Sequence, residues 1–159
     1  MDAKEFLAKL IELPGISGHE SQISQEIANA FKPYCDEVVV DNFYNVYGKK
    51  TGGAANGKPK IMLAAHMDEI GLMVKKIEKG GFIRFTNIGG VDQRILPTQE
   101  VWVHGKETLF GVIGAKPPHL QTQDETAKAI PMEDMAIDVG LPEEEVRKLV
   151  NVGELITFK

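Results

Sequence analysis

The sequence is poor in cysteine, in basic clusters and in long apolar runs. Its single cysteine, Cys35, cannot form an internal disulfide, which favours a reducing, cytoplasmic compartment. No apolar run approaches the roughly 20 residues of a membrane-spanning helix, and the first residues lack the pattern of a signal peptide. The net charge is −5, without a stripe of Lys and Arg. We therefore expect neither a membrane nor a nucleic acid as a partner.

The first seventy residues have the pattern of a layered α/β domain. With 159 residues, 43% of them hydrophobic, the chain can form one ordinary globular domain or two small ones. Helices are predicted over residues 2–12 and from the capping spacing of Ser17 and Glu20 to about residue 32. Short β-branched strands are predicted at 38–40 and 46–47, and an exposed turn at 52–57. The apolar run 61–65 predicts a strand buried on both faces, as in a parallel sheet.

The chain after Gly71 has a different pattern, with short strands separated by glycines. A β-hairpin with glycines at its turn is predicted from residues 72–77 and 82–88. Further strands are predicted at 100–104, 109–115 (broken by Gly111 and Gly114), 135–140 and 153–159, with a short helix from Pro142. Such a series is typical of a small barrel or sandwich. Residues 116–132, with three prolines and little periodicity, are expected to be mobile or functional.

A histidine and a carboxylate follow the predicted buried strand, at His66 and Asp68. In open α/β sheets, ligands bind outside the carboxyl ends of the strands, where these two side chains would lie. Neutral imidazole is a common metal ligand, and its second ring nitrogen usually contacts a carboxylate that sets the tautomer. A turn at Met67 would let the two converge. By spacing alone, however, a surface histidine beside a turn aspartate is the commoner arrangement.

The other histidines do not complete a metal site. His19 falls in a predicted capping turn and His104 beside a glycine, so we expect neither to bind metal, whereas His119 is left open. A catalytic zinc site takes about three protein ligands and a water. Glycoside hydrolysis is a further alternative, but it needs two carboxylates flanking the sugar. Asp68 and Glu69 are adjacent and do not provide that gap.

Several segments together resemble the M42 metallo-aminopeptidases, the family of the TET peptidases and glutamyl aminopeptidases. The resemblance runs in register through nearly the whole chain. The segments that carry it are Leu13-Pro14-Gly15-Ile16-Ser17-Gly18-His19-Glu20, Ala64-Ala65-His66-Met67-Asp68-Glu69-Ile70-Gly71, Ile88-Gly89-Gly90-Val91-Asp92 with Arg94, Leu96 and Gln99, Gly111-Val112-Ile113-Gly114-Ala115-Lys116-Pro117-Pro118-His119, and residues 134–140 and 153–158.

The resemblance implies an α/β fold in two parts. Residues 1–70 would be the N-terminal segment of a phosphorylase/hydrolase-like αβα catalytic domain, and residues 71–159 a β-rich, PDZ-like or barrel-shaped inserted domain of dimerisation or lid type. By the same resemblance, His66 binds one of two divalent metal ions, zinc or cobalt, and Asp68 orients it. The implied activity is hydrolysis of N-terminal residues from peptide substrates by a homo-oligomer.

The chain also departs from the family pattern. Family members are longer, and their other metal ligands and general-base glutamate have no counterpart here, so we expect a missing continuation. Thr98 stands where the family pattern has glycine. The chain alone is therefore expected to be inactive as an aminopeptidase. The alternative is that the β-rich part serves as a non-catalytic assembly or binding module.

Overall fold

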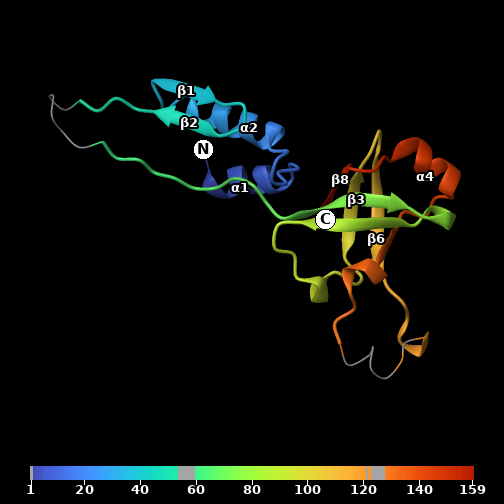
Figure 1. Cartoon of the computed structure of the whole chain (residues 1–159). Coiled ribbons are helices and arrows are strands. Elements are labelled where there is room, and N and C mark those ends of the chain that lie inside the picture. The colour runs from blue at the N-terminus through green and yellow to red at the C-terminus, as the bar shows by residue number, and fades with distance from the viewer. Residues whose placement is uncertain (1, 54–59, 121, 123–127) are drawn as a thin grey trace. The chain divides into compact units, whose positions relative to one another are not determined.

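The computed structural model of the chain describes residues 2–53, 60–120, 122 and 128–159 (Figure 1). These residues divide into two compact units, Met1–Glu69 and Ile70–Lys159, called unit 1 and unit 2 below. Most of the turn predicted at 52–57 lies outside the described residues, as do residues 121 and 123–127 of the segment 116–132. Among the described residues, no helix has the length and apolar character that crossing a bilayer requires.

Unit 1 contains two helices and one β-hairpin. Helix α1 spans Ala3–Ile11 and α2 spans Ser21–Phe31. Asp2 is the N-cap of α1, and its side chain accepts a hydrogen bond from the Lys4 amide (2.9 Å). Strands β1 (Glu37–Val40) and β2 (Val46–Lys49) pair antiparallel, which confirms that the two short runs share a sheet.

Glycine allows the hairpin of unit 1 to approach α2 closely. A Cβ atom at Gly48 would stand 2.7 Å from both the Cys35 Sγ and the Phe31 Cδ2. Any side chain on β2 at this position would therefore push the strand away from the helix. At the other end of the hairpin, the Asp41 side chain accepts from the Phe43 and Asn45 amides (2.8 and 2.9 Å) and closes the turn.

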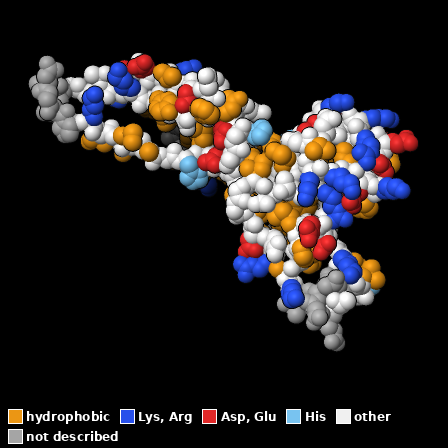
Figure 2. All heavy atoms as spheres, viewed as in Figure 1, with side chains coloured by type: hydrophobic (Ala, Val, Ile, Leu, Met, Phe, Trp, Pro, Cys, Tyr) orange, Lys and Arg blue, Asp and Glu red, His pale blue; other side chains and the backbone are white. Residues whose placement is uncertain are grey.

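The buried strand predicted at residues 61–65 is wrong. These residues form no strand, and Ile61, Met62 and Leu63 are 85%, 87% and 93% exposed. A strand buried on both faces needs backbone partners at its edges and apolar cover, and the described residues supply neither. The apolar face predicted for α1 is uncovered too, since Leu7 and Ile11 are 60% and 70% exposed. Figure 2 shows hydrophobic side chains gathered on the surface of unit 1.

Unit 2 is a closed six-stranded antiparallel barrel with the strand order β3-β4-β7-β6-β5-β8 (Figure 1). This outcome selects the barrel from the two predicted alternatives, and a PDZ-like insertion is not confirmed. The expected hairpin is present, with its glycine turn at positive φ (Gly80 84°, Gly81 90°). Pairing of Leu72 with Ile156 closes the barrel. The strands are β3 (Gly71–Ile77), β4 (Ile83–Ile88), β5 (Glu100–His104), β6 (Thr108–Gly114), β7 (Ala136–Asp138) and β8 (Leu155–Phe158).

Two details of unit 2 differ from the sequence prediction. Strand β6 runs unbroken through Gly111, because its missing side chain makes room for the Ile137 Cγ2, only 2.6 Å from where a Cβ would stand. The short helix α4 spans Glu143–Leu149, and Pro142 is its N-cap rather than its first residue. The helix is held to the barrel by Arg147, which donates to the Ile77 carbonyl at 2.7 Å.

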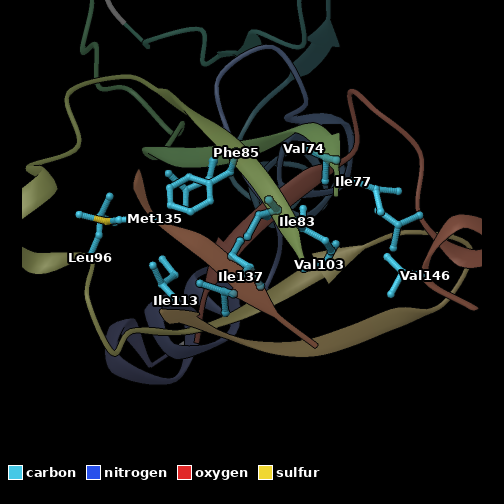
Figure 3. Close-up of a cluster of buried hydrophobic side chains, with 14 residues drawn as sticks. Val74, Ile77, Ile83, Phe85, Leu96, Val103, Ile113, Met135, Ile137 and Val146 are labelled. Carbon is cyan, nitrogen blue, oxygen red and sulfur yellow. The ribbon is translucent and has the colours of Figure 1, made fainter. Parts of the chain in front are cut away.

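One apolar cluster fills the barrel (Figure 3). Ile83 and Ile137 are fully buried inside it, and Val146 extends the cluster to α4. Full burial of a side chain of this size contributes about 1.5–3 kcal/mol each. The cluster consists of Leu72, Val74, Ile77, Ile83, Phe85, Leu96, Val101, Val103, Ile113, Met135, Ile137, Val146, Val150 and Ile156. The barrel therefore encloses its own core.

Candidate metal site around His66

The end of unit 1 is joined to the loop before α2. Ile16 and Glu69 form a parallel bridge, in which the Glu69 amide donates to the Gly15 carbonyl (2.8 Å) and the Ser17 amide to the Glu69 carbonyl (3.3 Å). The Glu69 side chain also accepts from the Gly15 amide (3.2 Å). Ile16 is fully buried, which anchors the loop. Asp68 is thus held beside a fixed segment although it lies outside regular structure.

Asp68 is bound through both of its carboxylate oxygens. Its Oδ2 accepts a short hydrogen bond from the Ser17 hydroxyl (2.5 Å), and its Oδ1 lies 3.2 Å from the His66 Nδ1. The Ser17 hydrogen bond, with a smaller contribution from His66, holds the pKa of Asp68 below its ordinary value of 3.8. The carboxylate is therefore ionised at neutral pH and accepts from both neighbours.

Among the described residues, Asp68 alone makes polar contacts with the imidazole of His66. Its Nδ1 lies 3.0 Å from the Asp68 carbonyl oxygen as well as 3.2 Å from the carboxylate. Because both neighbouring atoms are acceptors, we assign the proton of the neutral ring to Nδ1. The lone pair then lies on Nε2, and the side chain is 85% exposed. This is the form in which imidazole binds a divalent metal.

The residues present fit one ligand position and not a complete metal centre. Among the described residues, no group of three His, Cys, Asp or Glu side chains is placed to hold a metal ion. His104 belongs to β5 of unit 2, where its Nε2 contacts the Thr157 hydroxyl (2.8 Å) and burial lowers its pKa. His119 lies in a short 3₁₀ helix of unit 2, Pro118–Leu120. Both of these histidines belong to unit 2, whereas His66 belongs to unit 1.

Ser17 is the site residue that the sequence did not reveal. The predicted capping box is wrong, because α2 begins at Ser21 with Glu20 as an N-cap that makes no side-chain cap bond. The Glu20 side chain instead accepts from the Gly18 amide (2.8 Å), and Ser17 turns to Asp68, 51 residues away. Local spacing favoured the cap, and no sequence pattern links positions so far apart.

The sequence matches a known protein family and characterised relatives. The model of the M42 glutamyl aminopeptidase family matches residues 45–159. The lysyl aminopeptidase of Pyrococcus furiosus is 39% identical over 145 residues, which cover 89% of this chain and 40% of that protein.

Solved structures match over nearly the whole chain. An aminopeptidase from the archaeon Desulfurococcus kamchatkensis superposes with a TM-score of 0.88 at 40% identity, covering 98% of this chain and 42% of its own. The Pyrococcus horikoshii TET1 peptidase, which can assemble into a tetrahedron or a large octahedral shell, gives a TM-score of 0.80 at 38% identity, with coverages of 98% and 46%. The chain thus spans less than half the length of these relatives.

Proposed function

This chain belongs to the M42 glutamyl aminopeptidase family, and from that premise we propose that it forms the N-terminal part of a metal-dependent aminopeptidase. The proposed substrates are peptides, from which the N-terminal residue is hydrolysed. The observation that carries the proposal is the pair of His66 and Asp68, in which a carboxylate orients an exposed imidazole. We propose His66 as a metal ligand and Asp68 as its positioning partner.

The metals of the proposed enzyme are two divalent ions, zinc or cobalt. When bound, such ions polarise the scissile carbonyl and lower the pKa of a water molecule. This chain contributes the Nε2 lone pair of His66. Asp68 keeps that lone pair free because its carboxylate accepts a hydrogen bond from Nδ1, which holds the proton on that nitrogen. The described residues hold no group of three possible ligands, so we propose that further polypeptide of the enzyme supplies the remaining ligands and the general base.

We further propose that residues 1–70 belong to an αβα catalytic domain and that residues 71–159 form a domain inserted into it. The uncovered apolar residues of unit 1 support the first part. Leu63 is 93% exposed and Ile11 70%, as expected for surfaces that further polypeptide of the same domain would cover. The closed barrel supports the proposed insertion of residues 71–159, because a domain with its own apolar core keeps that core when it is inserted into another domain. A cytoplasmic location is proposed from the unpaired Cys35.

Metal titration of the chain tests the proposed ligand. On adding Zn²⁺ or Co²⁺ to the ¹⁵N-labelled chain, the imidazole resonances of His66 are expected to shift or broaden before those of His104. His66→Ala should also abolish the metal-induced shifts of the backbone amides of residues 67–69, whereas His104→Gln, which alters a histidine of the barrel, should retain them; these amide shifts are the response that is compared between variants. A response that is unchanged in His66→Ala contradicts the assignment.

An activity assay tests the expected inactivity of the chain alone. With aminoacyl amide substrates and added metal, we expect no turnover, because one histidine cannot hold a two-metal centre. Turnover that rises with metal concentration and disappears in His66→Ala would overturn this expectation.

The alternative function, an assembly module formed by the barrel, is favoured by one surface feature. Trp102 and Phe110 make an edge-to-face pair on the outer side of β5 and β6, with ring centroids 5.6 Å apart, and Phe110 is 42% exposed. The Lys159 Nζ lies 5.1 Å from the Phe110 centroid. Aromatic side chains of this kind are enriched at protein interfaces. We propose that this face contacts a second copy of the chain.

Light scattering tests the assembly module. The wild-type chain is expected to show an oligomeric mass that falls in Phe110→Ser and is unchanged in Phe82→Ser, an exposed phenylalanine before β4. A strictly monomeric wild-type chain at high concentration contradicts it.

A further inference from the structure

The hydroxyl of Ser17 lies where it can control the orientation of the Asp68 carboxylate. The two oxygens of Asp68 have separate partners, because Oδ2 accepts from Ser17 (2.5 Å) and Oδ1 faces the His66 Nδ1 (3.2 Å). A carboxylate rotates easily about its last torsion, which is broad in energy. A short bond to one oxygen therefore fixes the plane of the group and aims the other oxygen at the imidazole.

Ser17 itself is held more firmly than the groups that it contacts. Its amide is bonded to the Glu69 carbonyl (3.3 Å), and the preceding Ile16 is fully buried. After Ser17 the chain turns at Gly18, with φ of 86°, and the His19 amide closes the turn on the Ile16 carbonyl (2.8 Å). The serine hydroxyl is thus presented from a fixed backbone.

The imidazole of His66, by contrast, is held by few contacts. The His66 side chain is 85% exposed, and it follows an exposed segment without strand structure. Within the part of the chain that the structure describes, both of its polar contacts are with Asp68, whose side chain is 39% exposed. The order of dependence is therefore from Ser17 to Asp68 to His66.

We propose that Ser17 is a positioning residue for the metal ligand: it locks the Asp68 carboxylate so that His66 keeps its proton on Nδ1 and its lone pair on Nε2. This inference rests on the proposed function, in which that lone pair binds a metal. A purely structural role for Ser17, joining the loop to residues 67–69, predicts a different outcome, since the tautomer would then not depend on the hydroxyl.

The experiment reads the tautomer of His66 by long-range ¹H–¹⁵N correlation in the metal-free full chain. The spectra are recorded at a pH near 8.5. The wild type should show a protonated Nδ1 and an unprotonated Nε2. In Ser17→Ala the two ¹⁵N shifts should move toward each other as the tautomers mix, and Ser17→Thr, which retains a hydroxyl, should restore the wild-type pattern.

Two further variants keep the test decisive. Ser24→Ala removes a serine that donates to the Ser21 carbonyl (3.0 Å) and does not touch Asp68, so it should leave the tautomer unchanged. Ser17→Cys keeps the volume but donates only weakly, and it replaces Ser17→Ala if that variant disturbs the amide shifts of residues 15–18. Native amide shifts together with an unchanged tautomer, in Ser17→Ala or in Ser17→Cys, would overturn the proposal.

Zinc titration of the same samples separates this inference from the function on which it rests. Loss of a partner of this kind typically weakens metal binding by about 10–100-fold, so the zinc needed to shift His66 should rise at least about tenfold in Ser17→Ala. If zinc shifts His66 equally in wild type and Ser17→Ala, the positioning role fails while the ligand stands. If the tautomer responds to Ser17 but zinc never shifts His66, the proposed function fails while the positioning role stands.

Discussion

Unit 1 and unit 2 differ in how they bury apolar side chains. In the barrel of unit 2, fourteen apolar residues form one buried cluster that six strands and α4 surround. Among the described residues of unit 1, only Ile16, Ile23 and Ala28 are buried apolar residues. The candidate site lies in the unit with the smaller core, where hydrogen bonds rather than packing hold the functional side chains. The larger apolar core and the candidate site therefore lie in different units.

The largest expected effect is the loss of stability on truncating a buried leucine of unit 2, compared with an exposed leucine of unit 1. Leu72→Ala removes a fully buried side chain and should lower the free energy of unfolding by about 2–5 kcal/mol. Leu63→Ala removes a side chain that is 93% exposed and should change it by less than about 0.5 kcal/mol. Denaturant unfolding followed by circular dichroism and by the fluorescence of Trp102, the single tryptophan, measures both. Equal losses would remove the contrast between the units.

A glycine substitution tests how tightly the barrel is packed. A Cβ at Gly105 would stand 2.3 Å from the Leu149 carbonyl oxygen, which also accepts from the Lys106 amide (2.8 Å). Gly105→Ala should therefore cost about 1–3 kcal/mol, since backbone must move. Gly53→Ala in unit 1, where no described atom lies within 4 Å of the added Cβ, is the control and should be almost neutral. A stable Gly105→Ala variant in the same unfolding assay would contradict the tight packing.

Thr98 should be a site where glycine improves the barrel. Its φ of 72° is in the left-handed region, which costs a residue with a Cβ roughly 1–2 kcal/mol, and this explains the glycine expected there by family resemblance. Because glycine also gains entropy in the unfolded chain, Thr98→Gly should stabilise by up to about 1 kcal/mol. Thr86→Gly, on β4, should instead destabilise. If a thermal melt showed a lower melting temperature for both variants, the proposed backbone strain at Thr98 would be refuted.

The smallest effect concerns two exposed carboxylates, one in each unit. The side chain and amide of Arg94 lower the pKa of Asp92 to about 2, and the Thr51 amide is the main cause of the same value for Asp36. A depressed pKa stabilises the folded state fully above the ordinary value of 3.8, and this contribution is lost as pH falls through about 2. Arg94→Gln should raise the pKa of Asp92 and leave Asp36 unchanged in an NMR titration of the carboxyl carbons. A shift of both would indicate a general change rather than the loss of one pair.

Much of the fold could be predicted because its signals are local. The glycine turn at residues 80–81 and the strand Glu100–His104 each depend on neighbouring residues, and the structure confirms both predictions. His66 and Asp68 could also be selected as candidates, because two side chains that are two residues apart can contact each other where the chain is not extended. Their roles as ligand and partner stay predictions.

The tertiary structure decided whatever depends on distant segments. Whether residues 61–65 are buried depends on other segments that pack over them. An apolar run does not reveal whether such segments exist, and the described residues do not provide them. Barrel closure requires β3 to pair with β8, and the Ser17 bond to Asp68 requires Ile16 to bridge Glu69. In each case the local pattern specifies what a segment can do, while the free energy of long-range pairing and burial selects what it does.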